Sequence, residues 1–564
     1  MKNKAFLILP SVMMSLTGCF SNQPSSSSSS STNSSSSSVT SITDTESESS
    51  SISNSGSSST SEVIGEKVSQ LDLYCVNDFH GRISPQTSIT SNKTTIYEGG
   101  ISRLSTYLNQ QKSKNEEGTV FLNAGDLWQD TYDSGQNKGE LLTKAFKEIG
   151  FDAIALGNHE FDWGTEIIKH NKTIAESGDE KFTFLGCNIY NYDNSLDKAT
   201  TQASDIASPY KIIARGGTKI GIIGAIGENQ ITSITSRNWE NLTFLDPAPI
   251  VKDLSDKLRV EEKCDVIIYM LHAALKDSSY ESLSQNSPKT NKPYVDVGFL
   301  GHSHAFESEV VNNVPWIQSY HHGALTGHVT LSLKNDKYTA TYYSSYNDRT
   351  QNGFGNGNNS IYNCESDPKI DNIINQYLTP DFIKEKNTVV GKFLNVSSST
   401  FGDEAGEIQA YATSKYIDEL RKTNSSIPEV DLVFNNGNRA SINIDNDGNV
   451  TKEDIFNLIP FTNTTIIAEV SGSDIIGEMR YISYYLPKEK ALKIEPNKNY
   501  IVAGIDYVLL HKNAYRQYNY FPSYNGSIYE IEKYPFDIVS DYLLENKTFD
   551  ISIIKSTAFT GLTK

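Results

Sequence analysis

Short apolar segments alternate with polar loops and amphipathic stretches between residues 69 and 346. Seven segments are nearly all apolar and rich in β-branched residues, which predicts strands buried on both faces. They are residues 71–76, 119–122, 153–156, 182–186, 219–224, 265–271 and 295–300. Helical patterns lie between several of them, as at residues 100–112 and 140–149. This alternation predicts a layered α/β domain over residues 69–346.

Polar residues able to bind a metal follow five of these seven strands. They are Asp78, His80, Asp126, Asn158, His159, Asp162, His272, His302 and His304. Ligands of α/β sheets bind at the carboxyl ends of the strands, so we expect these side chains to meet there. Carboxylate and imidazole without thiolate suit Mn, Fe, Zn or Co better than calcium, and the set is large enough for two ions. A pair of such ions can promote the attack of water on a phosphoryl group.

The pattern changes after residue 346. Residues 351–359 are rich in Gly and Asn, which predicts loops, and residues 367–377 predict a helix within a linker spanning 347–387. A second domain, residues 388–564, mixes helical stretches at 407–422 and 473–485 with a strand at 430–434. We expect a smaller α+β domain here.

The N-terminus has the features of a targeting segment. Lys2 and Lys4 precede an apolar stretch, which predicts a signal peptide over residues 1–18. Leu16-Thr17-Gly18-Cys19 resembles a bacterial lipobox, and the resemblance implies cleavage before Cys19 and its lipidation. The Ser-rich residues 19–68 cannot bury enough apolar area to fold and predict a flexible tether. We expect a lipoprotein on the outer face of a bacterial cell membrane; an ordinary secreted protein is the alternative.

Charge and cysteine content limit the partners. The net charge of −19 argues against a nucleic-acid polymer, which requires a basic surface. It permits a small anionic substrate, because bound metal ions can invert the local field. The cysteines beyond Cys19, at positions 75, 187, 264 and 364, lack zinc-finger spacing, and we expect free thiols, with a disulfide left open. We expect a monomer.

Five motifs give the first domain a family resemblance. Asp-Phe-His-Gly at 78–81, Ala-Gly-Asp at 124–126, Gly-Asn-His-Glu-Phe-Asp at 157–162, His272 and Gly-His-Ser-His at 301–304 follow one another in this order. They resemble those of the calcineurin-like metallophosphoesterases, more narrowly the bacterial 5′-nucleotidase/UDP-sugar hydrolase branch. The resemblance implies a layered β-sandwich with helices outside, followed by a smaller α+β substrate-binding domain.

The same resemblance implies roles for the motif residues. One metal would be held by Asp78, His80, Asp126 and His304, and the other by Asp126, Asn158, His272 and His302. Asp126 would then bridge the two ions. His159 would contact the phosphoryl oxygens as a catalytic residue, and Asp162 would orient it. We expect His321 and His322 to be structural or to lie at the edge of the site.

In the second domain the resemblance is partial. Asn435-Asn436-Gly437-Asn438-Arg439 and Pro460-Phe461-Thr462-Asn463 resemble two loops of the family's nucleotide-binding domain. They imply Arg439 near the phosphate or ribose, Phe461 and Tyr507 as stacking walls, and Asn463 as a partner of the base. The family's Gly-Gly-Asp-Gly-Tyr segment has lost its glycines here, and Asn513 stands where the ribose-binding acid is expected.

These patterns favour a lipid-anchored phosphohydrolase that uses a dimetal-activated hydroxide on nucleoside 5′-monophosphates. A 2′,3′-cyclic nucleotide or a UDP-sugar as substrate is one alternative. A surface lipoprotein that binds another ligand is a second.

Overall fold

The computed structural model describes residues 66–556, with gaps at 90–93, 180, 345–348, 351–352, 355–359, 397–399, 402–403, 437–441, 445–446, 480, 486–493 and 514. Arg439, Cys19, the predicted signal peptide and nearly all of the predicted tether lie outside the described residues. Residues Val63–Lys564 group into one compact unit. Within the described part of the chain, every helix is too short or too polar to cross a membrane.

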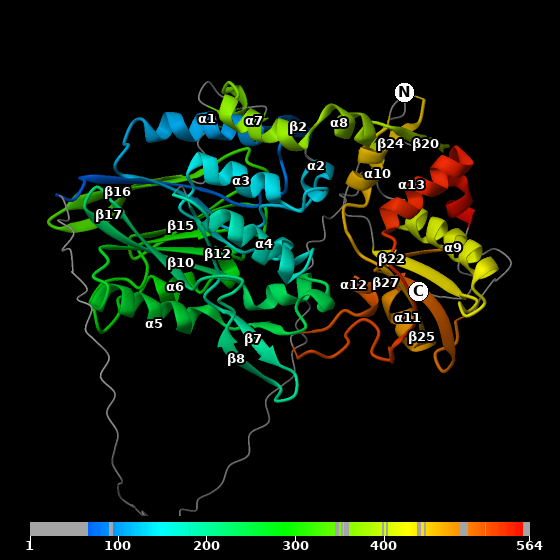
Figure 1. The fold of residues 1–564 in the computed structure, drawn as a ribbon. Helices are drawn as coiled ribbons and strands as arrows, with labels where there is room; N and C mark the ends of the chain where they lie inside the picture. The colour runs from blue at the N-terminus through cyan, green and yellow to red at the C-terminus, as the bar shows by residue number, and fades with distance from the viewer. Residues whose placement is uncertain are drawn as a thin grey trace, which may run out of the picture. The chain divides into compact units, whose positions relative to one another are not determined.

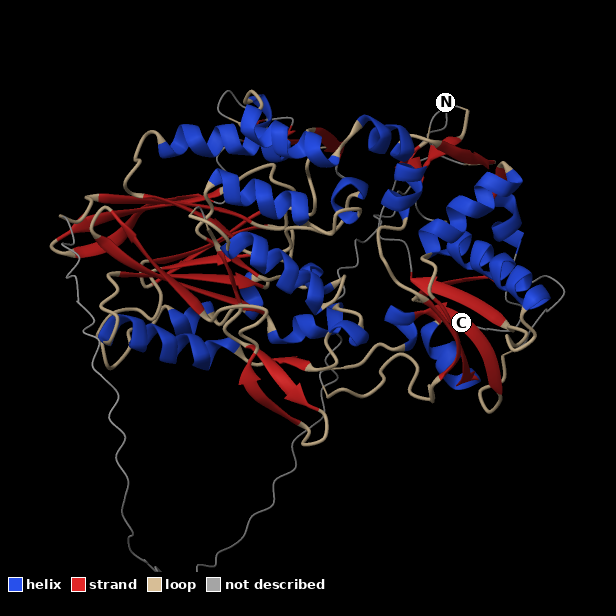
Figure 2. Ribbon diagram, viewed as in Figure 1, coloured by secondary structure: helices blue, strands red, loops and turns tan. Residues whose placement is uncertain are grey.

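Two sheets of six described strands each form the centre of the first domain (Figures 1 and 2). The first has the order β17 (Lys337–Ser344), β16 (Gly327–Lys334), β1 (Gln70–Val76), β4 (Thr119–Asn123), β5 (Ala153–Ala155) and β6 (Thr183–Leu185). The second has the order β14 (Phe306–Val311), β15 (Val314–Ser319), β13 (Val297–Leu300), β12 (Val266–His272), β10 (Thr218–Ile226) and β9 (Tyr210–Arg215). Strands β1, β4, β5 and β6 are parallel in the first sheet, and β10, β12, β13 and β15 in the second.

The two sheets pack face to face through alternate side chains of their strands. Leu71, Leu73 and Cys75 of β1 share a buried cluster with Ile268 and Met270 of β12. The outer face of the first sheet packs on α1 (Gly100–Lys112), α3 (Glu140–Ile149) and α4 (Thr165–Glu176). The outer face of the second packs on α5 (Pro247–Val260) and α6 (Tyr280–Leu283). The predicted layered sandwich with helices outside is confirmed, and burial on both faces explains why the strands are apolar throughout.

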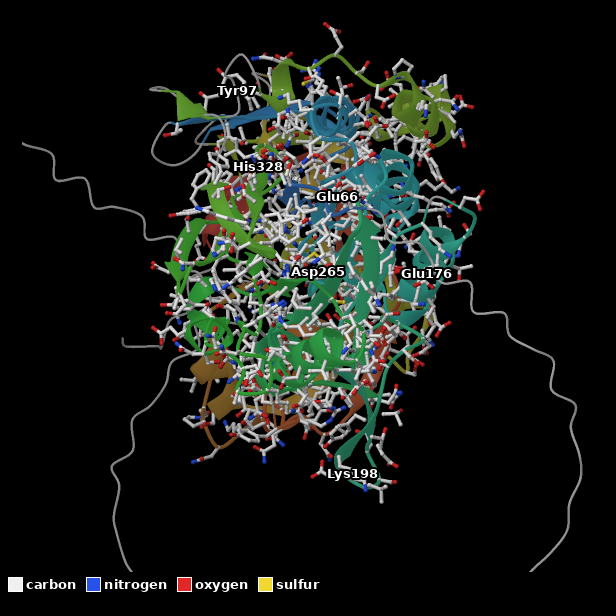
Figure 3. All side chains as sticks on the ribbon, turned by 90° about the vertical axis from the view of Figure 1, so that its left-hand side faces the viewer. Glu66, Tyr97, Glu176, Lys198, Asp265 and His328 are labelled. Atoms are coloured by element: carbon white, nitrogen blue, oxygen red, sulfur yellow. The ribbon has the colours of Figure 1, made fainter. Side chains whose placement is uncertain are left out.

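The parallel strands of both sheets begin at the same end of the sandwich. Figure 3 shows Glu66 and Asp265, which precede β1 and β12, near each other at the end facing the viewer. Lys67 Nζ lies 2.8 Å from Asp265 Oδ1 there. The carboxyl ends of β1, β4, β5, β12 and β13 therefore gather at the opposite end.

Two small sheets flank the sandwich. One has the order β11 (Leu242–Phe244), β7 (Ile189–Asp193) and β8 (Lys198–Gln202), with Lys198 at the end of its hairpin (Figure 3). The other has the order β18 (Arg349–Thr350), β19 (Gly353–Phe354), β3 (Thr95–Glu98) and β2 (Gln86–Ile89). The predicted linker helix is α7 (Pro368–Tyr377), and α8 (Pro380–Lys386) follows it.

The C-terminal domain is α+β. Its larger sheet has the described order β26 (Ile482–Tyr485), β22 (Leu432–Asn436), β27 (Asn499–Ile505), β25 (Thr465–Ser471) and β28 (Ser527–Ile531). A smaller one has the order β24 (Asn449–Thr451), β20 (Val389–Leu394) and β29 (Thr548–Asp550), and the pair β21 (Thr400–Phe401) and β23 (Ile442–Asn443) adds a third. Its helices are α9 (Ala405–Thr423), α10 (Lys452–Leu458), α11 (Gly472–Glu478), α12 (Asp506–Leu509) and α13 (Pro535–Asn546).

One predicted helix is wrong in its second half. The sequence pattern predicts a helix over residues 473–485, but α11 ends at Glu478 and residues 482–485 form β26. Strand β26 pairs antiparallel with β22, for example Ile482 with Asn436. The run Ile-Ser-Tyr-Tyr fits a pleated sheet, and this non-local pairing outweighs the local helical pattern.

Candidate active site

The ends of five parallel strands bring the predicted metal ligands together. Asp78 and His80 follow β1, Asp126 follows β4 and Asn158 follows β5. His272 is the last residue of β12, and His302 and His304 follow β13. Most of these side chains are buried; His302 and His304 are partly exposed. The carboxyl ends of these strands, where the strand pattern placed the ligands, therefore carry a compact cluster of carboxylate, amide and imidazole groups.

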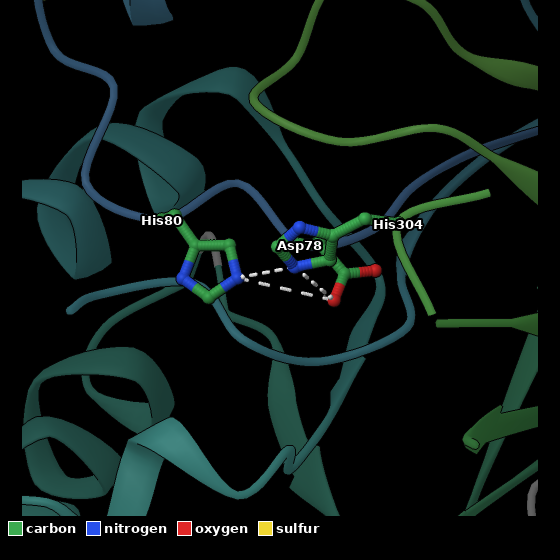
Figure 4. A group of neighbouring side chains, drawn as sticks. All are labelled: Asp78, His80 and His304. Carbon is green, nitrogen blue, oxygen red and sulfur yellow. Dashed lines mark hydrogen bonds and ion pairs between the residues drawn. The ribbon is translucent and has the colours of Figure 1, made fainter. Parts of the chain in front are cut away.

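The first half of this cluster contains Asp78, His80 and His304, which point toward one another (Figure 4). The Nε2 atoms of His80 and His304 are 2.9 Å apart, and His304 Nε2 lies 3.3 Å from Asp78 Oδ1. His80 Nε2 also lies 3.7 Å from Asp126 Oδ2. Two ring nitrogens that converge beside carboxylate oxygens form a set that suits a divalent transition-metal cation.

The second half contains Asp126, His272, His302 and Asn158. His272 Nε2 is 3.0 Å from Asp126 Oδ2 and 3.2 Å from Asn158 Oδ1. His302 Nδ1 is 3.0 Å from the same amide oxygen. Because Asp126 Oδ2 reaches both His80 and His272, this carboxylate lies between the two halves, where a bridging ligand belongs.

Main-chain carbonyls fix the orientation of two of these imidazoles. His80 Nδ1 lies 3.0 Å from the carbonyl oxygen of Gln129, and His272 Nδ1 lies 2.8 Å from that of Ala124. A ring whose Nδ1–H donates to a carbonyl keeps its Nε2 lone pair for a metal. These hydrogen bonds therefore set the tautomer that metal binding requires.

Glu160 holds two of the loops together and received no role from the sequence. Its carboxylate accepts the main-chain N–H groups of Asp126 at 2.9 Å, Leu127 at 2.7 Å and Gly157 at 2.7 Å. It is completely buried, and burial raises the pKa of this carboxyl to about 7. The signal in the sequence was its place inside the Gly-Asn-His-Glu motif, next to two site residues.

The backbone is strained at five of the seven candidate ligands. The φ angles are +48° at Asp78, +51° at His80, +54° at Asp126, +74° at His302 and +54° at His304. Non-glycine residues in this left-handed region carry on the order of 1–3 kcal/mol of strain each, and such residues cluster at functional sites. The hydrogen bonds described above, from main-chain N–H groups to Glu160 and from the imidazoles to main-chain carbonyls, hold these strained loops in place.

Burial and mutual charge shift the pKa values in opposite directions. Burial lowers the pKa of His80 to about 4, and the neighbouring His304 contributes in the same direction. Burial also disfavours a charged His272, but Asp126 outweighs it and raises the pKa of His272 to about 9. Metal ligands must be deprotonated, so a cation that binds here displaces the proton from His272.

His159 and Asp162 form a pair beside the cluster. His159 opens a short 3-10 turn, His159–Phe161, and its Nδ1 lies 2.7 Å from Asp162 Oδ2. Its main-chain N–H donates to Asp126 Oδ1 at 2.9 Å, and its ring lies 5.2 Å from that of His80. Both side chains of the pair are 16% exposed. The carboxylate therefore orients an imidazole that lies next to the candidate metal site and reaches the surface.

A cavity joins this pair to the C-terminal domain. Its walls are formed by Lys138, His159, Asp162, Trp163, Ser233, Thr235, Arg237, Asn238, Phe461, Thr462, Asn463, Thr464, Asp506, Tyr507 and Tyr534. The rings of His159 and Phe461 are 6.4 Å apart and inclined by 22°. Phe461, Asn463 and Tyr507, which were expected to bind the substrate, thus line one cavity with the predicted catalytic residue.

Two other predicted substrate residues are not part of this wall. Arg439 lies outside the described residues. Asn513 lies outside the cavity lining, and its side-chain oxygen accepts the main-chain N–H groups of Tyr515 at 3.0 Å and Gln517 at 3.1 Å. The expectation for Asn513 was based on the family's glycine-rich turn, and in this chain its side chain caps a turn. The acid that lines the cavity is Asp506, which the sequence did not single out.

A third group of possible ligands, Glu98, His321 and His322, lies beside the first. Its geometry is that of a hydrogen-bond network around the ion pair of Arg82 and Glu98. His322 Nδ1 is 3.0 Å from Glu98 Oε1, while Arg82 Nη2 is 3.2 Å from His322 Nε2. A neutral His322 that donates to Glu98 and accepts from Arg82 uses both ring nitrogens. The His321 ring is 4.7 Å from that of His304, so the pair lies at the edge of the site.

Comparisons with known proteins agree with this geometry. Residues 71–306 match the calcineurin-like phosphoesterase family, and residues 397–516 match the 5′-nucleotidase C-terminal domain. Residues 71–306 therefore form a calcineurin-like phosphoesterase domain, which makes the chain a metal-dependent hydrolase. Together with the second match, this gives the chain the two-domain organisation of the 5′-nucleotidases.

Several relatives share most of the chain. An apyrase of Tabanus yao is 28% identical over 434 residues, which are 72% of this chain and 72% of the relative. A 5′-nucleotidase of Rattus norvegicus is 26% identical over 445 residues, 72% of this chain and 70% of the relative. The crystal structure of a 5′-nucleotidase precursor from Thermus thermophilus has a TM-score of 0.62 at 18% identity, covering 85% of this chain and 97% of that one. The last likeness shows the shared fold.

Proposed function

We propose that this hydrolase removes phosphate from nucleoside 5′-monophosphates. The observation that carries the proposal is the shared cavity, in which the His159–Asp162 pair and the aromatic residues Phe461 and Tyr507 line the same walls. One end offers groups suited to a phosphoryl group and the other offers rings suited to a base. The relative from Rattus norvegicus, named a 5′-nucleotidase, supports this substrate class.

Seven side chains would hold two divalent cations. They are Asp78, His80, Asp126 and His304 for one, with Asp126 shared, and Asn158, His272 and His302 for the other. Oxygen and imidazole ligands of this kind suit Mn, Zn, Co or Fe. When bound, two such cations neutralise phosphoryl oxygens and promote the attack of water on phosphorus.

The chain's own catalytic group is His159. Its ring is held by Asp162 through the 2.7 Å contact at Nδ1, so it can face a phosphoryl group without reorienting. An oriented donor of this kind stabilises the negative charge that develops on the phosphoryl oxygens. The hydrogen bond from its main-chain N–H to Asp126 Oδ1 keeps His159 next to the candidate metal site.

Asn463 is fixed so that it accepts a hydrogen bond from the base. Its Nδ2 donates to Asp506 Oδ1 at 2.8 Å and to Thr235 Oγ1 at 3.2 Å, which uses both N–H groups. Among the described residues no donor reaches its Oδ1. This oxygen is left to accept an N–H group from the edge of a base stacked between Phe461 and Tyr507.

The test compares a nucleotide with a small aryl phosphate. Stacking of a base on an aromatic ring contributes roughly 1–3 kcal/mol, so Phe461→Ala should raise KM for AMP by about ten-fold or more. An aryl phosphate, which needs the metal site and not the stacking walls, should be affected far less. The matched control is Tyr515→Ala, since Tyr515 is 84% exposed. Equal loss on both substrates, or a wild-type preference for aryl phosphate over every nucleotide, would remove the nucleotidase assignment.

A panel of substrates separates the alternatives. Phosphate release from AMP, a 2′,3′-cyclic nucleotide and a UDP-sugar should be measured with added Mn or Co. We expect AMP to give the highest kcat/KM. A higher value for the cyclic nucleotide or the UDP-sugar would keep the phosphoesterase and change its substrate.

We further propose that the protein is a monomer anchored by a lipid at Cys19 on the outer face of a bacterial cell membrane. The supporting pattern is Leu16-Thr17-Gly18-Cys19 ahead of a Ser-rich tether. Two acyl chains anchor a protein stably, whereas one does so marginally. Cys19→Ala should move the protein from the membrane to the soluble fraction, and identical fractionation of both forms would contradict the anchor.

A further inference from the structure

The segment that carries Phe461 and Asn463 is attached to the phosphoesterase domain on both sides of Phe461. We call residues 460–464 the clamp segment and residues 66–344 the phosphoesterase domain. The clamp segment begins directly after α10 and its neighbouring residue Ile459 and leads into β25. Two side chains of the phosphoesterase domain, Gln129 and Thr235, bond to it.

Gln129 makes the first attachment. Its Nε2 donates to the carbonyl oxygen of Pro460 at 2.6 Å, and the residue is 3% exposed. Pro460 is buried as well, so loss of the Gln129 donor would leave the Pro460 carbonyl oxygen buried and without this hydrogen bond. A buried polar group left unpaired destabilises its conformation by roughly 1–3 kcal/mol.

Gln129 also touches the candidate metal site, through a different atom. Its main-chain oxygen is the group that lies 3.0 Å from His80 Nδ1. A single residue thus holds the ring of His80 with its backbone and the clamp segment with its side chain. A change of the side chain alone leaves the backbone contact available to His80.

Thr235 makes the second attachment. It lies between the 3-10 turns Glu228–Ser233 and Ser236–Asn238, and its Oγ1 accepts from Asn463 Nδ2 at 3.2 Å. Phe461 lies between the two attachment points, and its ring stands 6.4 Å from that of His159. Residues of the phosphoesterase domain therefore bond to the clamp segment on both sides of the ring that lies near His159.

We propose that Gln129 and Thr235 are positioning residues that determine how well the enzyme discriminates a nucleotide from a simple phosphate ester. They act through Phe461 and Asn463 and do not touch the reacting atoms. The inference rests on the proposed nucleotidase function, because it concerns the same cavity. Nucleotide selectivity then depends on how the clamp segment is held in place, in addition to the ring of Phe461 that it carries.

The experiment measures the ratio of kcat/KM for AMP to kcat/KM for an aryl phosphate. Gln129→Met keeps the length and apolar volume of the side chain and removes the donor. Thr235→Val keeps the shape and removes the acceptor. We expect the ratio to fall about ten-fold in Gln129→Met. The fall should be smaller in Thr235→Val, because that hydrogen bond is longer. In both variants the change should appear in KM for AMP. Gln136→Met is the control, because Gln136 is exposed and lies close to Gln129 in the sequence.

A double variant distinguishes positioning from a general loss of structure. If Gln129 acts through Phe461, the variant carrying Gln129→Met and Phe461→Ala should be no worse on AMP than Phe461→Ala alone. Fully additive losses would overturn the proposal, as would an equal fall on both substrates. Should Gln129→Met fail to fold, Thr235→Val decides alone: an unchanged ratio rejects the proposal. A wild type that hydrolyses the aryl phosphate but no nucleotide would instead reject the proposed function.

Discussion

The two walls of the cavity are built in different ways. On the phosphoesterase side, the candidate ligands stand at the ends of five parallel strands, mostly buried and linked to backbone groups of their own domain. On the C-terminal side, Phe461, Asn463 and Tyr507 come from loops and a short helix and are half-buried. Asn463 reaches its place partly through a bond to the other domain. The candidate metal site is thus built within one domain, while the candidate base-binding wall depends on how two domains meet.

The largest effect should come from the residue shared by both halves of the candidate metal site. Asp126→Ala removes the carboxylate that reaches His80 and His272, so we expect both ions to be lost together with the activity on every substrate. Elemental analysis of purified protein measures the ions. Asp197→Ala is the control, an exposed aspartate of the β7–β8 hairpin. Retention of nearly two ions per chain in Asp126→Ala would contradict the bridging role.

His159 should give the next largest effect. His159→Asn should keep the metal content and lower kcat by about 10² or more, the usual size of one lost charge-stabilising or acid–base group. The loss should be similar for AMP and for the aryl phosphate, because His159 serves the phosphoryl group common to both. Asp162→Asn should have a smaller effect, since it leaves the imidazole in place. Full activity in a metal-loaded His159→Asn protein would make the histidine structural.

The sequence predicted the first wall far better than the second. Strand ends are local features, and the residue types at five of them, such as Gly-Asn-His-Glu, specify both position and chemistry. The second wall depends on long-range contacts that no spacing reveals. Asn513 holds a turn, whereas the acid in the cavity is Asp506, and Gln129 reaches Pro460 across 331 positions of sequence. The sequence pattern does not predict the strand at residues 482–485 for the same reason, because its partner strand β22 is distant in the chain.

Asn463 offers a finer test of the second wall. Because its Oδ1 is the atom left for the base, a nucleotide whose base has no N–H donor should bind poorly. Purine riboside 5′-monophosphate differs from AMP only in lacking the amino group. The wild type should prefer AMP by about ten-fold, the size of one unmade hydrogen bond in a desolvated site. Asn463→Ala should abolish that preference; a preference that survives the substitution would place the donor's partner elsewhere.

The smallest effect concerns the helix that leads from one domain to the other. Glu140 of α3 accepts from Tyr377 of α7 at 2.6 Å and from Lys144 at 2.7 Å, and the hydrogen bonds from Lys144 and Tyr377 lower the pKa of Glu140 to about 2. A carboxyl with a lowered folded-state pKa stabilises the fold above its unfolded pKa, and the contribution is lost as pH falls toward about 2. Glu140→Gln should therefore unfold at lower urea than the wild type at neutral pH. The difference should shrink steadily with acidification, and a constant difference would exclude this origin.

The left-handed backbone at Asp78, His80, Asp126, His302 and His304 has a consequence for how such an enzyme can change over generations. Glycine adopts these φ angles without strain, so a change to glycine at any of the five positions would relieve backbone strain while removing a candidate metal ligand. Selection for stability alone would thus favour loss of the site, and an inactive descendant could have a higher free energy of unfolding than the active enzyme.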